Sequence, residues 1–259
     1  MNLFGLTLSD VQKFFLIFIR LATIMAIIPF YGERSVPIQL KLGLALLISV
    51  IVYPLLTGAA VPQETQSLLG FSVSMLQSLL AGLMVGFIPL MLFAGVQLGG
   101  ELIGFQMGFG ITSVLDPLSQ IRMSLIAQFE YILAMLIFIT LDGHLYFLQG
   151  IVKSFQVVPL VGASFPNVLG EALVDLSREI FIIGLKIAAP IMVTIFLTNV
   201  GLGILGRTMP QMNIFIVGFP LQIGVGLVVL GMSIPAFAFV FEKMFHAFYS
   251  KWLALIVTF

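Results

Sequence analysis

The sequence predicts an all-α integral membrane protein, and three observations support that fold class. First, 60% of the 259 residues are hydrophobic and only 8% are charged, whereas soluble domains carry about 25% charged residues. Second, residues 65–100 and 208–241 contain no Asp, Glu, Lys, Arg or His, and each run exceeds the ~20 residues that a membrane-spanning helix needs. Third, these runs are much longer than the roughly 10 alternating residues of a membrane β-strand.

Composition and charge exclude several classes of function. Eleven Lys and Arg residues balance eleven Asp and Glu residues, so no excess charge indicates a nucleic-acid partner. The sequence has no Cys, and His144 and His246 are too few for a histidine cluster. We therefore expect no metal, no cofactor and no nucleic acid. The sequence has no Gly-x-Ser-x-Gly elbow, no His-Glu-x-x-His motif and no phosphate-binding loop, so we expect no enzymatic activity.

Seven apolar segments, each interpreted as a helix, follow one another along the chain. They cover residues 11–30, 38–61, 68–100, 123–141, 144–165, 178–206 and 213–241. We expect the first segment to be retained and not cleaved as a signal, because Lys13 and Arg20 lie within it and no positively charged region precedes it. Turn-forming sequences that separate the segments lie at 32–37, 58–62, 116–117, 142–143 and 206–210. The stretch 143–170 contains two prolines and is expected to be the least regular part.

Two of the apolar runs are too long for one straight crossing. As a straight helix, residues 65–100 would be about 54 Å long, against a hydrocarbon core of about 30 Å. Pro89 is expected to kink this helix, and Pro220 and Pro235 the last one, because proline lacks the backbone N–H. Within a membrane, the polar groups freed at such kinks need protein or water as neighbours. Long kinked helical hairpins of this kind suit a wall made of several subunits.

The most unusual segment is residues 99–117. Gly100, Gly104 and Gly108 recur every four residues, a spacing that lets helix backbones approach closely. From Gly108 onward, glycines and β-branched or hydroxyl-bearing residues weaken a helix, and the Asp-Pro pair at 116–117 would end one. We expect a non-helical apolar loop that is held within protein.

Five charged residues lie inside apolar segments, where charges are costly and usually paired. They are Lys13, Arg20, Glu101, Glu130 and Lys186. Their spacing puts Lys13 and Arg20 on one helix face, and we expect Arg20 to be buried against a carboxylate or a backbone carbonyl. Structural pairs within a protein assembly are the expected role of these charges. The alternative is that they couple ions in a transporter.

One charge contrast indicates the orientation in the membrane. Residues 171–179 carry three acidic residues and one basic residue, whereas the turn before the last segment carries a single Arg. The positive-inside rule then places this turn on the cytoplasmic side. The turn consists of Arg207, Thr208, Met209, Pro210, Gln211 and Met212.

Five pieces of the sequence carry a resemblance to a known family. They are 29–37 (PFYGERSVP), 99–119, 141–145 (LDGHL), 206–213 (GRTMPQMN) and 218–220 (GFP). Together they resemble the family of the flagellar biosynthetic protein FliR, the R/T-type export-gate subunits of type III secretion systems, in the family's order and over nearly the whole chain. The resemblance implies a P-type-like helical part at residues 1–170 and a Q-type-like hairpin at residues 171–259, in an assembly partly lifted out of the bilayer plane.

The resemblance also implies a function. It implies a bacterial inner-membrane protein at the flagellar basal body that joins P-type and Q-type subunits (FliP and FliQ), together with FlhB and FlhA, in a gate for unfolded flagellar proteins. It further implies a non-helical loop that plugs the pore, formed by Gln106, Met107, Gly108, Phe109, Gly110, Ile111, Thr112, Ser113, Val114, Leu115 and Asp116. Two alternatives stay open, namely the equivalent subunit of a virulence injectisome and a small secondary transporter.

Overall fold

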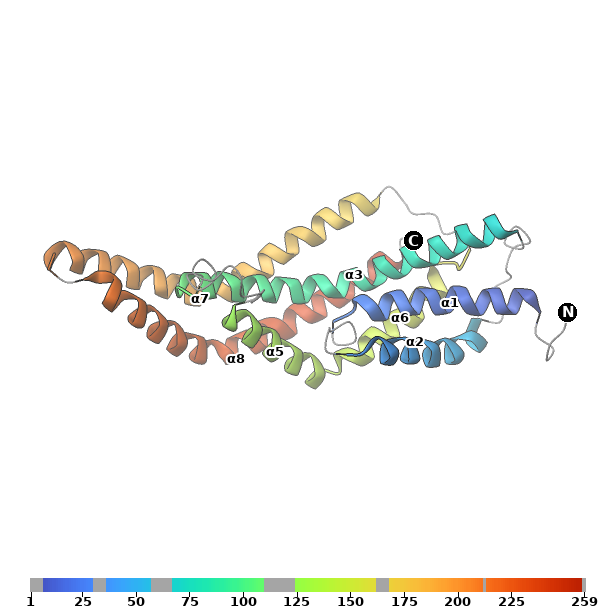
Figure 1. Ribbon diagram of the computed structural model, residues 1–259, viewed down its shortest axis with the longest axis horizontal. Coiled ribbons are helices and arrows are strands. Elements are labelled where there is room, and N and C mark those ends of the chain that lie inside the picture. Colours follow the sequence, from blue (N-terminus) through green and yellow to red (C-terminus); the bar gives the residue numbers. More distant parts are fainter. Residues whose placement is uncertain are drawn as a thin grey trace. The chain divides into compact units, whose positions relative to one another are not determined.

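The computed structural model describes residues 7–29, 36–56, 67–109, 124–161, 168–211 and 213–257, and the regular structure in these ranges is helical. Figure 1 labels the elements along the chain. They are α1 (Leu8–Ile27), α2 (Ile38–Val52), the short 3-10 helix η1 (Tyr53–Leu56), α3 (Leu68–Gln106), α5 (Leu125–Thr140), α6 (Gly143–Val157), α7 (Val168–Thr208) and α8 (Ile214–Val257). The predicted all-α fold is confirmed.

Several of these helices are long and apolar enough to cross a membrane. Four such spans lie in the described ranges, or five if α5 and α6 count together as one span. The four are Ile38–Leu56, Leu68–Gln106, Ser177–Thr208 and Ile216–Ala254. The chain is therefore an all-α membrane protein, as its composition predicted.

Some helix boundaries differ from the predicted ones. Residues from Gly143 to Val157 form the regular helix α6, so the expectation of irregular structure is wrong for this part. α8 continues to Val257, well beyond the predicted end at residue 241. Charged residues end the apolar run there, but Glu and Lys are good helix formers. Hydropathy locates apolar runs, and a helix can extend past them.

The chain divides into two compact units. Unit 1 consists of Met1–Met91, Asp142–Leu176 and Ala247–Phe259, and unit 2 consists of Leu92–Leu141 and Ser177–His246. The predicted P-type-like and Q-type-like parts describe similarity to other subunits, and that division stays a prediction.

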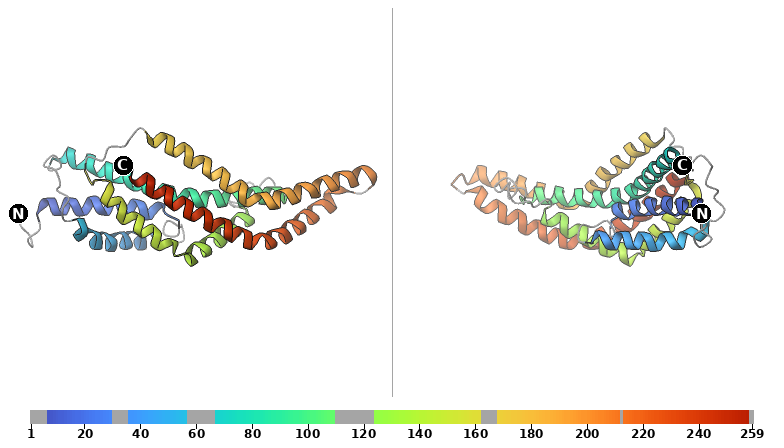
Figure 2. Two further views of the ribbon diagram at one scale, coloured as in Figure 1. Left: turned by 180° about the vertical axis from the view of Figure 1, so that it is seen from behind. Right: turned by 45° about the vertical axis from the view of Figure 1, so that its right-hand side comes forward.

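In unit 1, α1 buries one face against neighbouring helices. Figures 1 and 2 show α1 and α2 side by side. Two glycines of α3 lie against α1: a Cβ added to Gly82 would be 2.8 Å from the Arg20 carbonyl oxygen, and one added to Gly86 would be 3.4 Å from Cα of Ile24. The buried face of α1 includes Lys13, Leu16, Ile17, Arg20, Leu21 and Ile24. This confirms that Lys13 and Arg20 share one face.

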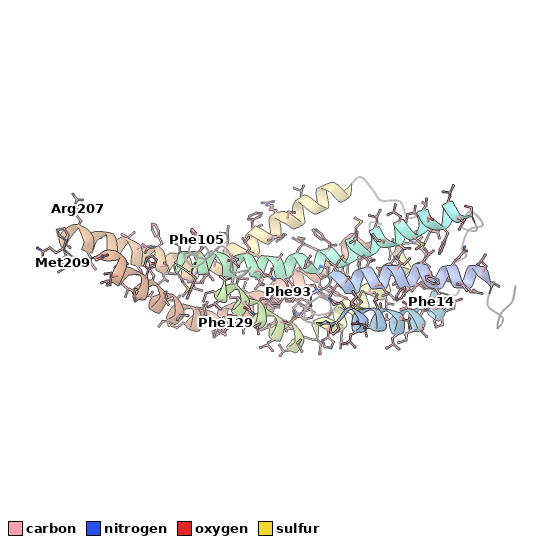
Figure 3. All side chains as sticks on the ribbon, in the orientation of Figure 1. Phe14, Phe93, Phe105, Phe129, Arg207 and Met209 are labelled. Carbon is pink, nitrogen blue, oxygen red and sulfur yellow. The ribbon has the colours of Figure 1, made fainter. Side chains whose placement is uncertain are left out.

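In unit 2, aromatic rings of α3, α5 and α8 form the centre of the core. The Phe93 ring, labelled in Figure 3, has its centroid 5.7 Å from that of Tyr131, 5.6 Å from that of Phe138 and 6.0 Å from that of Phe241. The three contacts are edge-to-face, the geometry that aromatic quadrupoles favour. In the same unit, α7 and α8 form a hairpin joined by a short turn (Figure 2).

Candidate functional site

The end of α3 and the start of α5 are in close contact through glycines of α3. A Cβ atom added to Gly100 would lie 2.3 Å from Cα of Ala127, and one added to Gly104 would lie 2.6 Å from Oγ of Ser124. Cβ atoms essentially never approach other atoms this closely, so a larger residue at either position would push the helices apart. This confirms the close backbone approach that the glycine spacing predicted.

Glu101 and Ser124 fix the first turn of α5 against α3. The Oε1 atom of Glu101 accepts a hydrogen bond of 2.8 Å from the backbone N–H of Ser124. Ser124 is also the N-cap of α5, because its hydroxyl oxygen accepts a bond of 3.0 Å from the backbone N–H of Ala127. The two bonds satisfy donors that the helix itself leaves without acceptors. Glu101 thus has a backbone partner within this chain.

The C-terminal end of α3 is closed by backbone hydrogen bonds. The N–H of Gly108 donates to the carbonyl of Phe105 at 3.1 Å, and that of Phe109 donates to the carbonyl of Gly104 at 3.0 Å. Gly108 has a φ of 91°, in the left-handed region that glycine adopts without strain. Together these features form a Schellman motif, which ends α3 at Gln106.

The turn that follows α3 packs onto α8. A Cβ added to Gly108 would lie 2.9 Å from the Phe219 ring, and one added to Gly226 would lie 2.7 Å from Cε of Met107. Glycine at both positions therefore leaves room for a larger neighbour. Met107 is fully buried in a cluster with Ile103, Ile126, Ala188, Ile191, Ile195 and Leu230.

The structure describes the beginning of the predicted plug loop. Gln106 is the last residue of α3, and Met107, Gly108 and Phe109 form the packed turn. The remaining predicted plug residues lie outside the described residues: Gly110, Ile111, Thr112, Ser113, Val114, Leu115 and Asp116. Phe109 and Ser124, the described residues on either side of segment 110–123, are both held in unit 2. The plug itself stays a prediction.

Arg20 is a fully buried cation of unit 1. Its side chain is 0% exposed, and its guanidinium donates bonds of 2.9 Å to the carbonyl of Val158 and 2.8 Å to that of Pro159. The guanidinium also lies 4.9 Å from the centroid of the Phe155 ring. Burial lowers the pKa of Arg20 to about 10, so the side chain stays charged at neutral pH. The expectation that Arg20 is buried against a carbonyl partner is confirmed.

Lys13 makes a similar contact on the same face of α1, about two helical turns earlier. Its ammonium group donates to the carbonyl of Leu56, the last residue of η1, and lies 5.8 Å from the centroid of the Tyr53 ring. Both basic residues of α1 therefore bind carbonyls at or just beyond the C-terminal end of another helix, where the helix dipole favours cations. Nearby Asp10 is half-buried, and a hydrogen bond from the Thr7 side chain lowers the pKa of its carboxyl.

The other two predicted charges lie together in unit 2. Glu130 of α5 and Lys186 of α7 line the same cavity. Glu130 is buried, whereas Lys186 is exposed. Because they lie 56 positions apart in the sequence, the sequence gave no sign that they would line one cavity.

The predicted cytoplasmic-side turn forms the tip of the α7–α8 hairpin. Figure 3 shows Arg207 and Met209 there. Thr208 ends α7, and its hydroxyl donates to the carbonyl of Leu205 at 3.0 Å. The described residues of this turn are all exposed: Arg207, Thr208, Met209, Pro210 and Gln211. Met212 lies outside the described residues, and the cytoplasmic placement stays a prediction.

Trp252 is a site that the sequence analysis did not identify. Its indole Nε1 donates a bond of 3.1 Å to the carbonyl of Val85, the group that would accept from residue 89 in a regular helix. Residue 89 is proline, so that donor is missing. Gly150 of α6 leaves room for the indole, because a Cβ there would lie 2.3 Å from Cζ3. A proline inside a helix signals a free carbonyl, but the sequence does not identify its donor.

Among the described residues, no group of three or more His, Cys, Asp or Glu side chains could hold a metal ion. The hydrogen bonds of Arg20, Lys13, Glu101 and Trp252 join side chains to backbone carbonyls or N–H groups. They hold helix ends and helix pairs in place.

Comparison with known proteins gives one family and several relatives. The sequence model of the bacterial export proteins, family 1, matches residues 11–248. The flagellar biosynthetic protein FliR of Escherichia coli K12 is 33% identical over 243 residues, which cover 94% of this chain and 92% of that protein. The Bacillus subtilis FliR is 35% identical over 238 residues, or 90% of each chain. The Pectobacterium carotovorum FliR is 36% identical over 232 residues, or 87% of this chain and 85% of that protein.

Proposed function

The chain belongs to the bacterial export proteins, family 1, and from that membership we propose that it is a non-enzymatic subunit of the flagellar type III secretion export gate. In this role it helps to form, and with residues 106–116 to plug, a channel for unfolded flagellar proteins. The observation that carries the proposal is the family match over residues 11–248, which includes most of α1 and α8 and all of the other described helices.

The names of the relatives favour a flagellar apparatus over a virulence injectisome. The three relatives reported above are flagellar biosynthetic proteins, and each aligns with this chain over most of its length. If the proposal is right, the chain restores swimming to cells that lack their own flagellar counterpart. Recovery of needle secretion without recovery of swimming would favour the injectisome.

The geometry near residue 109 supports a plug built on a fixed base. Phe109 is tied to α3 by the Schellman motif, and Ser124 is tied to Glu101. The segment 110–123 thus starts and ends on one compact unit. Its apolar residues and Gly110 supply the bulk that excludes ions and the backbone freedom to move aside.

The observed contacts of the charges support a structural role. Arg20 and Lys13 bind helix-end carbonyls, and Glu101 binds the backbone N–H of Ser124, the N-cap of α5. An ion-coupling site of a secondary transporter needs its charged groups free to meet the ion. These three residues are already engaged, so we favour the gate subunit over the transporter.

We place the chain in the bacterial inner membrane at the flagellar basal body, next to P-type and Q-type subunits (FliP and FliQ) and to FlhB and FlhA. The exposed apolar residues of α2, α7 and α8 support such neighbours. Examples are Leu47, Ile51, Phe196, Val228 and Phe239. Partner helices would cover these side chains within the assembly.

Native mass spectrometry of mild-detergent extracts tests the assembly. We expect the chain in complexes that contain P-type and Q-type subunits. A well-folded lone monomer as the single species observed would contradict the proposal.

The plug assignment needs a separate measurement. Removing two or three residues from 110–116 should leave assembly intact but raise ion conductance per assembled gate, because a gap in an apolar constriction lets water and ions enter. Removing two residues from 162–167, the connection between α6 and α7, is the matched control and should not raise conductance. An unchanged conductance in a fully assembled 110–116 variant would rule out the plug and leave the gate subunit standing.

A further inference from the structure

Glu130 is a buried carboxylate that faces an unfilled space in unit 2. Its side chain is 3% exposed, and its Oε2 atom has no hydrogen-bond partner within the described part of the chain. It lines a cavity with a volume of about 50 Å³. Residues of α5, α7 and α8 form the walls, among them Phe129, Ile187, Pro190, Leu230 and Phe237.

The cavity contains one other charged residue, Lys186 of α7. Lys186 is exposed and takes part in no ion pair within the described ranges. The remaining polar side chain in the lining is Ser233, whose hydroxyl donates to the carbonyl of Leu230 at 2.8 Å. The Ser233 hydroxyl proton is therefore already donated to a backbone carbonyl, so it does not supply a hydrogen bond to Oε2 of Glu130.

Each of the two charges is costly without a partner of opposite charge. A carboxylate buried without a partner costs far more than one that is paired, because burial removes its hydration. Lys186 lies in a helix that is apolar enough to span a membrane, where lysines turn toward protein and pair with acidic groups. Glu130 lacks a positively charged partner and Lys186 lacks a negatively charged one, so each could neutralise the other.

The size of the cavity fits an ammonium group. A water needs roughly 10–15 Å³ of such volume, so 50 Å³ accommodates a compact ammonium and a few waters. The four-carbon stem of lysine is flexible and carries its charge at the tip. Lys186 already lines the cavity, so a rotation of its side chain is the movement that pairing with Glu130 requires.

We propose that this cavity is an ammonium-binding site whose occupant is the side chain of Lys186, paired there with Glu130. The pair joins α5 to α7 inside unit 2. It does so one helical turn before Pro190, which cannot donate to the carbonyl of Lys186. The ion pair therefore braces α7 at a turn that lacks a backbone hydrogen bond. The inference is independent of the export function.

The test compares Glu130→Gln, Lys186→Met and the double variant of the full-length chain, expressed with its partners and extracted in mild detergent. The readout is the midpoint of thermal aggregation of the tagged chain. We expect each single change to lower the midpoint by about 5 °C or more, since it leaves one charge unpaired. The double variant should fall by clearly less than the sum of the two shifts.

Matched controls use the neighbouring charges of α8. Glu242→Gln and Lys243→Met alter exposed residues outside the cavity, and their midpoints should stay near the wild-type value. Lys186→Arg keeps the charge and should lose less than Lys186→Met.

Each other outcome overturns the proposal. If Glu130→Gln leaves the aggregation midpoint unchanged, Glu130 is protonated and has no ion pair to lose. If Glu130→Gln lowers the midpoint but Lys186→Met does not, a partner subunit supplies the cation. Additive shifts mean that the two residues do not interact. If a single variant fails to accumulate, recovery in the double variant or in the exchange Glu130→Lys with Lys186→Glu supports the pair, and failure of both overturns it.

Discussion

Trp252 donates its indole N–H to the carbonyl oxygen of Val85 across 3.1 Å. Val85 lies in α3 four residues before Pro89, which has no N–H to offer. The last part of α8 thus provides the donor that α3 lacks. Because Trp252 is 1% exposed, water cannot easily replace it.

Trp252→Phe should lower the free energy of unfolding by about 1–3 kcal/mol, because the Val85 carbonyl loses its donor. In a Pro89→Ala background the loss should be smaller, since residue 89 then supplies its own N–H. Thermal unfolding followed by circular dichroism at 222 nm measures the loss of stability in the wild-type and in the Pro89→Ala background. Equal losses in the two backgrounds would mean that the indole acts through packing alone.

Gly150→Ala should destabilise the protein, by about 1–3 kcal/mol, because the new Cβ would lie 2.3 Å from the Trp252 ring. Gly203→Ala is the matched control, because nothing lies within 4 Å of a Cβ at that position. There, alanine should be neutral or add up to about 1 kcal/mol through helix propensity. The same melting experiment compares them, and a Gly150→Ala protein as stable as wild type would contradict the packing described here.

Arg20→Leu should reduce the amount of assembled protein in membranes, because the carbonyls of Val158 and Pro159 lose their donors inside the core. The loss of stability should be about 2 kcal/mol or more. Arg20→Lys should be milder, although a single ammonium cannot reproduce the two-pronged contact. Quantitative blotting of membrane fractions checks that the amount of protein falls from wild type to Arg20→Lys and further to Arg20→Leu. Equal amounts for wild type and Arg20→Leu would show that the bonds contribute nothing.

Gly108→Ala should destabilise the end of α3 by about 1–2 kcal/mol, because an alanine at a φ of 91° is strained. The Phe219 ring adds a contact of 2.9 Å to the new Cβ. Adding Phe219→Ala to the Gly108→Ala variant removes the contact but not the backbone strain, so it should restore only part of the lost stability. Protection of α3 amides in hydrogen exchange reports the effect, and full rescue would show that the strain is absent.

Local features of the sequence predicted local features of the structure. The spacing of Gly100 and Gly104 predicted close contact with another helix, and the burial of Arg20 against carbonyls followed from the cost of an unpaired charge. The weakening of the helix from Gly108 onward predicted where α3 ends. In each case the physical cause lies within a few residues of the chain.

Contacts between distant parts of the chain were not predictable in this way. Trp252 and Val85 are 167 positions apart, and Ser124 lies 23 positions after Glu101. Each pair depends on which helices pack together, and hydropathy carries no information about that choice. The same reason explains why the sequence did not predict that Glu130 and Lys186 line one cavity.

The two anchors of segment 110–123 set a geometric limit on it. Phe109 and Ser124 are both fixed, so fourteen residues form a closed span whose contour is about 50 Å at roughly 3.4 Å per residue. No point on the span can move more than about half that contour, or roughly 25 Å, away from its anchors. If residues 106–116 form the proposed plug, the chain on both sides of that plug is therefore anchored in unit 2, and the plug stays within this reach of the two anchors.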